Sequence, residues 1–297
     1  MNVEGKDHRF GGDWTSRKLR ILEHYLLSYR KVMQNQPFRV GYIDAFAGTG
    51  YRAPKAAEQA HAPLLFPDLA APEPQALLDG SARLALQVQP PFDRYIFIEK
   101  SKARCEALET LRSDFSELSS AIEVRRGEAN SVIQELCNLN WDAHRAVLFL
   151  DPYGMQVEWK TIESIAGTKA IDMWLLFPQG IGVNRLLCSK PEEIPQSWRN
   201  RLTTLLGTPA WEKDFFEETV ENYLFGQEER VVKASMERIG GYFVDRLKTV
   251  FPGVSERPAV LQNSTGSPLY LFCFAAANEK GAKVALKIAD YLLSENR

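Results

Sequence analysis

The chain has 297 residues, of which 45% are hydrophobic and 25% are charged, and its formal net charge is -2. This length and apolar content suffice for a full core, in one large domain or in a domain with insertions. The net charge excludes a global basic field, so any contact with nucleic acid has to come from a local patch. No apolar run approaches the ~18 residues that a membrane span needs. The charged N-terminus lacks a signal-peptide pattern, so we expect a soluble, cytoplasmic protein.

Cysteine and histidine spacing argues against a metal site. The four cysteines lie far apart in the sequence, without paired spacing, and the four histidines show no ligand spacing. We therefore expect buried thiols in a reducing compartment, with neither disulfides nor a bound metal.

The hydrophobic pattern predicts alternating helices and strands. An amphipathic helix over 14–35 is followed by a strand over 39–45, and the Ala- and Pro-rich segment 51–79 is expected to be a long insertion loop. The next predicted elements are helix 80–89, strand 95–98, helix 101–115, strand 121–125, helix 129–138, strand 146–150, helix 158–166 and strand 170–177. Because these strands are nearly unbroken apolar runs between helices, they predict a parallel sheet covered on both faces.

The C-terminal part departs from this alternation. Extended runs at 254–262 and 268–276, on either side of a turn at 263–266, predict an antiparallel hairpin, and a last helix is expected over 279–294. The predicted organisation is an N-terminal helix and core over 1–179, an inserted helical subdomain over 180–250, and a hairpin and helix over 251–297 that complete the core. The predicted fold class is therefore α/β, with a Rossmann-like sheet of five parallel strands plus an antiparallel hairpin.

The first candidate site follows strand 39–45. There Asp44 and Phe46 lead into a loop with two glycines, Gly48 and Gly50. Glycines let the backbone approach a nucleotide-like ligand closely, and open α/β sheets bind ligands at the carboxyl ends of their strands. The loop is neither a dinucleotide fingerprint, since a third glycine is missing, nor a P-loop. We expect Asp44 to bind an ammonium group or a water; a tight turn without a ligand is the alternative.

Glu99 ends the strand over 95–98, at the position where a carboxylate can bind the hydroxyls of a ribose. It lies 49 residues beyond Gly50, against about 20 in the usual pattern. The insertion over 51–79 accounts for the excess. The alternative is a surface ion pair with the adjacent Lys100.

Glu128 and Asn130, just past strand 121–125, could each reach the amino group of an adenine. The alternative for Asn130 is a helix N-cap, which is compatible with a binding role.

The second decisive motif is Asp151-Pro152-Tyr153-Gly154, which ends the strand over 146–150. A carboxylate on Asp151 and the carbonyl of Pro152 could accept the N–H groups of an exocyclic amine, and Tyr153 could stack on a base outside its helix. A plain strand-ending turn is the alternative. Further along, Asn184 and Arg185 could bind a substrate phosphate, although a solvated helix face is the simpler interpretation. Together with the first motif, this turn indicates methyl transfer from S-adenosylmethionine to an amino group.

Several of these motifs resemble the three-Cys-motif partner protein family, TcmP. The resemblance covers nearly the whole chain and rests on Tyr42 to Gly48, Gly80-Ser81, Phe97 to Lys100, Gly127 to Asn130, Leu150 to Gly154 and Pro268 to Phe272. It implies a Rossmann-like class I methyltransferase fold and a neighbour protein that carries a three-cysteine motif. It further implies cofactor contacts by the residues of the glycine loop, by Glu99 with Lys100 and by Glu128 or Asn130. Asp151 to Tyr153 would lie at the target amine, with Gly154 in contact with the substrate.

The turn is also similar to the Asp-Pro-Phe-Gly turn of tRNA guanine-N2 dimethyltransferases and is related to the Asp-Pro-Pro-Tyr turn of adenine-N6 methyltransferases. Tyr153 replaces the second proline and Gly154 replaces the aromatic residue of the latter, which favours guanine over adenine. We expect a methyltransferase acting on an exocyclic amine of a nucleic-acid base, with RNA favoured. The alternatives are methyl transfer to a protein or small molecule, and a non-catalytic or sensor partner of the three-cysteine protein.

Overall fold

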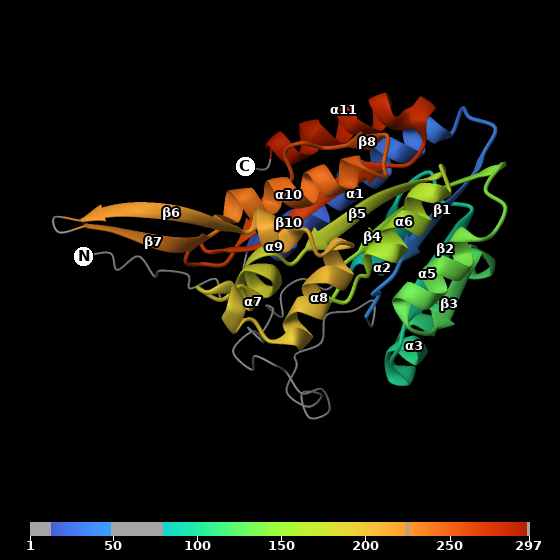
Figure 1. Cartoon of the computed structure of the whole chain (residues 1–297). Coiled ribbons are helices and arrows are strands. Elements are labelled where there is room, and N and C mark those ends of the chain that lie inside the picture. The colour runs from blue at the N-terminus through green and yellow to red at the C-terminus, as the bar shows by residue number, and fades with distance from the viewer. Residues whose placement is uncertain (1–12, 49–79, 224–225, 296–297) are drawn as a thin grey trace, which may run out of the picture.

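The structure, a computed structural model, describes residues 13–48, 80–223 and 226–295. In this part of the chain an eight-stranded sheet has the order β3-β2-β1-β4-β5-β10-β8, and β9 also pairs with β10 (Figure 1). The five strands that are mutually parallel are β1 (Arg39–Asp44), β2 (Arg94–Glu99), β3 (Ile122–Arg126), β4 (His144–Leu150) and β5 (Ile171–Phe177). The predicted parallel sheet is confirmed.

The predicted C-terminal hairpin is also confirmed. β9 (Ala259–Gln262) and β10 (Pro268–Ala276) are antiparallel, β10 pairs antiparallel with β5, and the short β8 (Gly253–Val254) closes that edge. The turn between β9 and β10 forms because the Asn263 side-chain oxygen accepts hydrogen bonds from the backbone N–H groups of Thr265 and Ser267, at 3.1 and 2.8 Å. The sheet is thus largely parallel with an antiparallel C-terminal edge, which is the methyltransferase-like arrangement.

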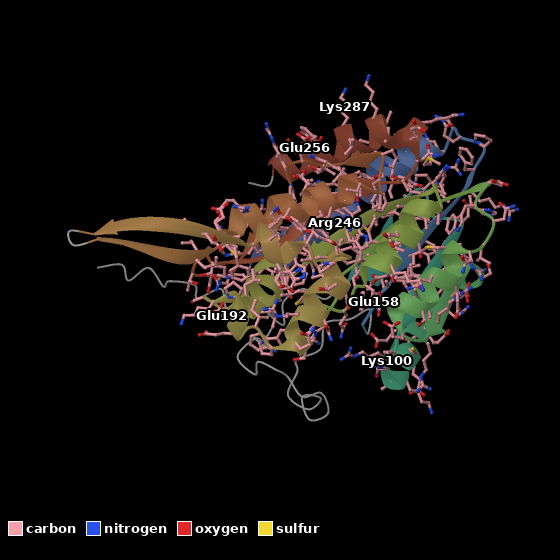
Figure 2. All side chains as sticks on the ribbon, in the orientation of Figure 1. Lys100, Glu158, Glu192, Arg246, Glu256 and Lys287 are labelled. Atoms are coloured by element: carbon pink, nitrogen blue, oxygen red, sulfur yellow. The ribbon has the colours of Figure 1, made fainter. Side chains whose placement is uncertain are left out.

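Helices cover both faces of the sheet. One face carries α1 (Asp13–Met33), α2 (Ser81–Gln87), α3 (Lys102–Glu109), α4 (Leu111–Asp114) and α11 (Glu279–Glu295). The other face carries α5 (Ala129–Cys137), α6 (Trp159–Gly167), α8 (Gln196–Leu206) and α10 (Met236–Lys248). Short 3-10 segments, η2 (Ser116–Ala121) and η4 (Pro191–Glu193), join some of these elements. Charged side chains such as Lys287 on α11 and Glu192 on η4 lie on the outside (Figure 2).

Helix α1 is held against the sheet by its apolar face. Leu22 and Tyr25 are almost completely buried, and full burial of a leucine contributes about 1.5–3 kcal/mol. The Tyr25 hydroxyl donates a 2.6 Å hydrogen bond to Asp172 of β5, and its ring meets that of Trp174 edge-on at 5.2 Å. Burial raises the pKa of Asp172 to about 7, although the hydrogen bond from Tyr25 acts in the opposite direction.

The segment over 180–250 is mainly helical, but the prediction missed a hairpin within it. After the π-helical turn η3 (Gln179–Val183), α7 (Asn184–Leu186), α8 and α9 (Trp211–Asp214), strands β6 (Phe216–Tyr223) and β7 (Gly226–Lys233) pair antiparallel. The hairpin projects from the body in Figure 1. Its mixture of glutamates with Val, Thr and Tyr gives no helical period. Glutamate is uncommon in strands, so the strand preference of Val, Thr and Tyr was not recognised in the sequence.

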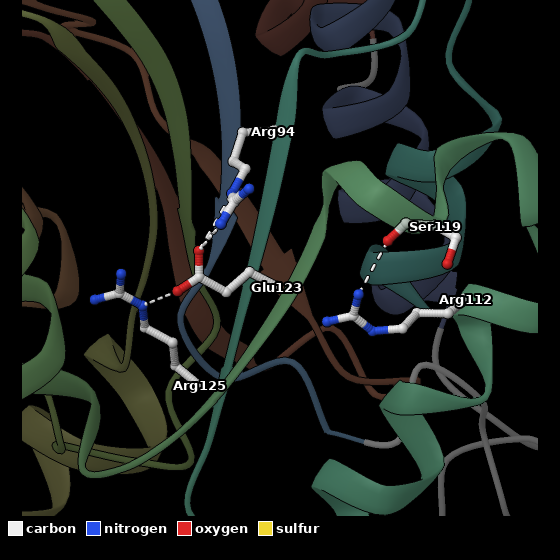
Figure 3. A network of polar contacts seen from close by, with 5 residues as sticks. All are labelled: Arg94, Arg112, Ser119, Glu123 and Arg125. Atoms are coloured by element: carbon white, nitrogen blue, oxygen red, sulfur yellow. Dashed lines mark hydrogen bonds and ion pairs between the residues drawn. The ribbon is translucent and has the colours of Figure 1, made fainter.

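The outer strand β3 is protected by charge. Glu123 of β3 accepts hydrogen bonds from Arg94 of β2 at 2.6 Å and from Arg125 at 2.6 Å (Figure 3). Charged side chains on an edge strand oppose pairing with another chain. A second contact in the same view connects α4 to η2, because Arg112 donates to the carbonyl of Ser119 at 3.0 Å.

Candidate active site

The candidate site lies where the strand order reverses. β1 pairs with β2 on one side and with β4 on the other, so the connections from β1 and from β4 diverge at their carboxyl ends, where open α/β sheets bind ligands. Three carboxylates follow this edge: Glu99 ends β2, Asp44 ends β1 and Asp151 comes directly after β4. In register, Asp44 is level with Phe149, so Asp151 is only two residues further along the neighbouring strand.

Asp44 is a buried carboxylate with spare hydrogen-bonding capacity. Its Oδ2 accepts a hydrogen bond from the Tyr42 hydroxyl at 3.3 Å, whereas its Oδ1 has no hydrogen-bond partner among the described residues. Burial raises the pKa of Asp44 to about 7; a hydrogen bond from Ser81 lowers it and the negative charge of Asp151 raises it. A buried acceptor without a partner is costly, so this oxygen is a strong candidate to receive a donor from a ligand.

The loop after β1 keeps contact with both neighbouring strands. Ala45 N–H donates to Phe149 and Ala47 N–H donates to Ile98, at 3.1 and 3.2 Å. Phe46 is half-buried against the core, and Gly48 has a positive φ of 63° with open space around its missing side chain. The open space that the described residues leave is at Gly48, whereas Asp44 itself is fully buried. Gly50 and the predicted insertion over 51–79 lie outside the described residues.

Glu99 is buried, with a relative exposure of 8%. Its Oε1 accepts the backbone N–H of Ser101 at 2.8 Å, and its Oε2 lies 3.7 Å from a guanidinium nitrogen of Arg104. Among the described residues this longer ion pair is the contact given for the second oxygen, which keeps capacity to accept a hydroxyl donor. The alternative that predicted an ion pair between Glu99 and Lys100 is wrong, because the cation near Glu99 is Arg104. Lys100 is exposed at the periphery beside α3 (Figure 2).

The structure separates the roles of Glu128 and Asn130. Glu128, not Asn130, caps α5, because its carboxylate accepts from the N–H of Ser131 at 2.9 Å. Burial would raise the pKa of Glu128, but the hydrogen bonds from Ser131 and Asn130 outweigh it, so the pKa lies below its ordinary value.

Asn130 is a structural bridge. Its amide donates to Glu128 and to the carbonyl of Gln156, both at 2.8 Å, and its oxygen accepts from Glu158 N–H at 3.0 Å and from the Thr161 hydroxyl at 2.9 Å. All of its hydrogen-bonding capacity is used, so Glu128 is the better candidate for a ligand contact. The exposed carboxylate of Glu128 can accept further donors.

The turn after β4 presents the predicted acceptor residues. Asp151 is half-buried, Pro152 is buried, and Tyr153 is 53% exposed. Gly154 has a positive φ of 77°, which lets the chain turn away from the sheet. The next residue, Met155, packs against Gly182 of η3, because a Cβ on that glycine would lie 2.8 Å from the Met155 side chain. Tyr153 is thus displayed at the surface beside a fixed carboxylate.

Lys18 of α1 is the functional candidate that the sequence reasoning missed. It is only 4% exposed, its ammonium forms an ion pair with Asp151 Oδ2, and it lies 5.0 Å from the centre of the Trp14 ring. Helical spacing in the sequence could have identified Lys18. It precedes the buried Leu22 and Tyr25 by four and seven residues and so lies on the apolar face of the helix. A lysine on a buried face requires a partner.

The remaining substrate candidates lie on α7. Arg185 is exposed, whereas the carbonyl of Asn184 accepts a 3.1 Å hydrogen bond from Lys233 of β7. Some basic side chains of α1 are buried and do not face solvent. Besides Lys18, Arg30 is buried and donates to the carbonyl of Pro90 at 3.1 Å.

Three further features of the described ranges concern metal-ligand clusters, membrane-spanning helices and the state of the cysteines. Residues 13–48, 80–223 and 226–295 contain no cluster of three His, Cys, Asp or Glu residues placed to hold a metal. Within the same ranges, no helix combines the length and apolar character that a membrane span requires. All four cysteines are free thiols; Cys105 and Cys273 are buried as predicted, but Cys137 and Cys188 are only partly so.

No protein-family model and no curated protein matches the chain. Similar solved structures include a protein from Legionella pneumophila, with 13% identity over 82% of this chain and 94% of that chain and a TM-score of 0.41. A methyltransferase from Geobacter sulfurreducens has 11% identity over 71% and 78% of the two chains and a TM-score of 0.32. Spermidine synthase from Thermotoga maritima has 9% identity over 90% of this chain but only 60% of that chain, with a TM-score of 0.40. All three TM-scores are below 0.5, so the description of the fold rests on the sheet order of this chain itself.

Proposed function

We propose that the protein is an S-adenosylmethionine-dependent methyltransferase that acts on an exocyclic amine of a nucleic-acid base, with RNA favoured. The observation that carries the proposal is the row of carboxylates at the strand switch point, in which one oxygen of the buried Asp44 has no hydrogen-bond partner among the described residues. A ligand that joins a cationic amino-acid group to a nucleoside fits this row of carboxylates. Its ammonium and its ribose hydroxyls are hydrogen-bond donors, and the carboxylates at the ends of adjacent strands are acceptors.

Asp44 would bind the ammonium of the methionine part. A carboxylate whose pKa is about 7 is held near the boundary between its neutral and charged forms, and a bound cation favours the charged form. Tyr42, Ser81 and the backbone N–H of Phe46 hold the carboxylate, and Oδ1, which has no partner within 13–48, 80–223 and 226–295 by hydrogen-bond geometry, is the oxygen left for the ligand.

Glu99 and Glu128 would hold the nucleoside part. Glu99 stands at the end of β2, where its Oε2 can accept from ribose hydroxyls. Glu128 lies at the N-terminus of α5, beyond β3, and would accept from the adenine amino group, with Asn130 fixing its position. Phe46 and Gly48 would line the loop side, with Lys100 at the rim.

The turn after β4 would hold the acceptor. Asp151 and the carbonyl of Pro152 would accept the two N–H groups of the amine, which points its lone pair at the methyl group, while Tyr153 stacks on the flipped base. When bound, S-adenosylmethionine supplies a methyl group on a sulfonium sulfur: the amine nitrogen forms the new N–C bond, the electron pair of the broken C–S bond stays on sulfur, and the amine releases a proton. Gly154, Asn184 and Arg185 would contact the rest of the substrate.

One observation favours a second candidate. The acceptor carboxylate Asp151 is already paired with Lys18, as expected if no amine ever binds there. The fold would then act as a non-catalytic or sensor partner of a three-cysteine-motif protein, which the resemblance of the sequence implies. Transfer to a protein or small molecule would use the same cofactor contacts with a different acceptor.

The test is calorimetric titration of the purified protein with S-adenosylmethionine and S-adenosylhomocysteine. We expect micromolar binding that is lost in Asp44→Ala and Glu99→Ala and retained in Glu135→Gln, which changes an exposed carboxylate of α5. Transfer of labelled methyl to RNA from a strain that lacks the protein should then depend on Asp151. Absence of cofactor binding by well-folded wild type would reject the enzyme and leave the partner role, to be sought by a pull-down.

A further inference from the structure

Lys18 brings a fixed positive charge to the acceptor end of the site. It comes from α1, lies 133 residues before Asp151 in the sequence, and is one of the most buried charged side chains of the described chain. Its ammonium pairs with Oδ2 of Asp151 and lies beside the face of Trp14, whose own ring lies 5.3 Å from that of Tyr270. The packing of α1 therefore determines where this charge lies.

The pair changes the charge that an acceptor meets. Asp151 alone would present a half-buried negative charge, which attracts any ammonium ion. With Lys18 bound, the two charges cancel, while Asp151 keeps acceptor capacity on its other oxygen. The same side chain can then accept N–H groups without attracting cations.

We propose that Lys18 determines the charge class of the acceptor: it makes the site select a neutral amine and exclude a cationic alkylamine. The inference rests on the proposed methyl transfer and names the substrate class of that same site. Lys18 is a specificity-determining and positioning residue, because it acts through Asp151.

The chemistry of methyl transfer explains why a site would select a neutral amine. An alkylamine with a pKa near that of lysine, about 10.4, is protonated at neutral pH and has no lone pair for a methyl group. Bound to an unpaired Asp151, it would block the site without reacting. The exocyclic amine of a nucleobase is uncharged at that pH and needs only hydrogen-bond acceptors. Lys18 occupies the position that an alkylammonium would take and repels it.

The experiment uses the full chain saturated with S-adenosylhomocysteine and two probes, putrescine as a dication and guanosine as a neutral aromatic amine. Wild type, Lys18→Met, Lys18→Arg and Lys31→Met are titrated with each probe. Lys31 is a matched control, because it is an exposed lysine near the other end of α1. Thermal melts establish that each variant is folded.

We expect putrescine to bind Lys18→Met at least about tenfold more tightly than wild type, a difference of about 1.4 kcal/mol. Lys18→Arg and Lys31→Met should behave as wild type, and adding Asp151→Asn to Lys18→Met should abolish the gain. The preference for the sulfonium cofactor over its neutral product should also rise in Lys18→Met alone, because Asp151 becomes an unpaired negative charge. If Lys18 had only a structural role, Lys18→Met would change neither the putrescine affinity nor the preference for the sulfonium cofactor over its product.

Equal putrescine affinity in wild type and Lys18→Met would overturn the proposal. So would a methyl group found on Lys18 by peptide mass mapping after incubation with S-adenosylmethionine, since Lys18 would then be a substrate. If Lys18→Met does not fold, wild type still decides: putrescine binding as tight as guanosine binding refutes the exclusion. Failure of wild type to bind either cofactor form is a separate result, which rejects the methyltransferase itself.

Discussion

Asp44 ends β1 and Asp151 directly follows the neighbouring parallel strand β4, and the negative charge of Asp151 helps to raise the pKa of Asp44. The larger cause is the burial of Asp44, and the result is a carboxylate that is destabilised when ionised. Such destabilisation in the absence of a ligand is typical of binding sites, where a partner later offsets it. The relationship leads to predictions on stability, on cofactor recognition and on the acceptor.

Asp44→Asn should stabilise the ligand-free protein at high pH. The folded-state pKa is about 7 and the ordinary value is 3.8, so the contribution of this group to stability is complete below pH 3.8 and is lost as the pH rises through 7. Three pH units at about 1.4 kcal/mol each give ~4 kcal/mol as the upper limit of the gain at pH 8. Urea unfolding at pH 4 and pH 8 measures it. Asp142→Asn, at an exposed site, is the control, and an equal effect of Asp44→Asn at both pH values would contradict the prediction.

Adenosine should distinguish the roles of Asp44 and Glu99. It has the ribose but lacks the ammonium, so Glu99→Gln should weaken its binding tenfold or more, whereas Asp44→Asn should leave it unchanged. Both variants should bind S-adenosylhomocysteine more weakly than wild type does. For wild type, S-adenosylhomocysteine affinity should rise between pH 6 and pH 8, because its ammonium binds the ionised form of Asp44, while adenosine affinity should stay level. Calorimetry at the two pH values measures both, and loss of adenosine binding in Asp44→Asn would show that the assignment is wrong.

Asn130→Ala should destabilise the fold more than it weakens cofactor binding. The change leaves the buried hydroxyl of Thr161 without its acceptor, at about 1–3 kcal/mol for an unsatisfied buried group, and it removes the partner of two part-buried backbone groups, the carbonyl of Gln156 and the N–H of Glu158. A loss of roughly 2–4 kcal/mol in the free energy of unfolding is expected from chemical denaturation. Asn138→Ala, at an exposed position after α5, should cost far less. Similar losses in the two variants would mean that the bridge does not hold α5 to α6.

Tyr153 should matter for nucleic acid and not for the cofactor. Tyr153→Ala removes a stacking surface of about 1–3 kcal/mol per base, so methyl transfer to RNA should weaken at subsaturating substrate by about 5- to 150-fold. Tyr153→Phe should keep most of the activity, and S-adenosylmethionine affinity should stay the same in both. The matched control is Tyr291→Ala, a tyrosine of α11 that is similarly exposed, at 58%. Full activity of Tyr153→Ala on RNA would argue for a protein or small-molecule acceptor.

The sequence by itself determined the order of the elements and the positions of the strand-end carboxylates. Mainly apolar runs set the strands, and the runs of β2 and β4 stop where an acidic side chain appears, at Glu99 and after Leu150. Because the carboxyl ends of parallel strands meet at one edge, these local patterns also brought Asp44, Glu99 and Asp151 together. The hairpin of β9 and β10 followed from its turn residues, which act over only a few positions.

Only the tertiary structure decided which polar atoms meet across that edge. It placed Lys18 on Asp151 and used all hydrogen-bonding groups of Asn130 between α5 and α6. In the part of the chain that the structure describes, it left one oxygen of Asp44 without a partner. It also revealed the hairpin of β6 and β7, whose composition gives no clear period. The physical reason is that a hydrogen bond or ion pair depends on distances of a few ångströms between elements far apart in the chain. Periodicity fixes the face on which a side chain lies, but only packing fixes its partner.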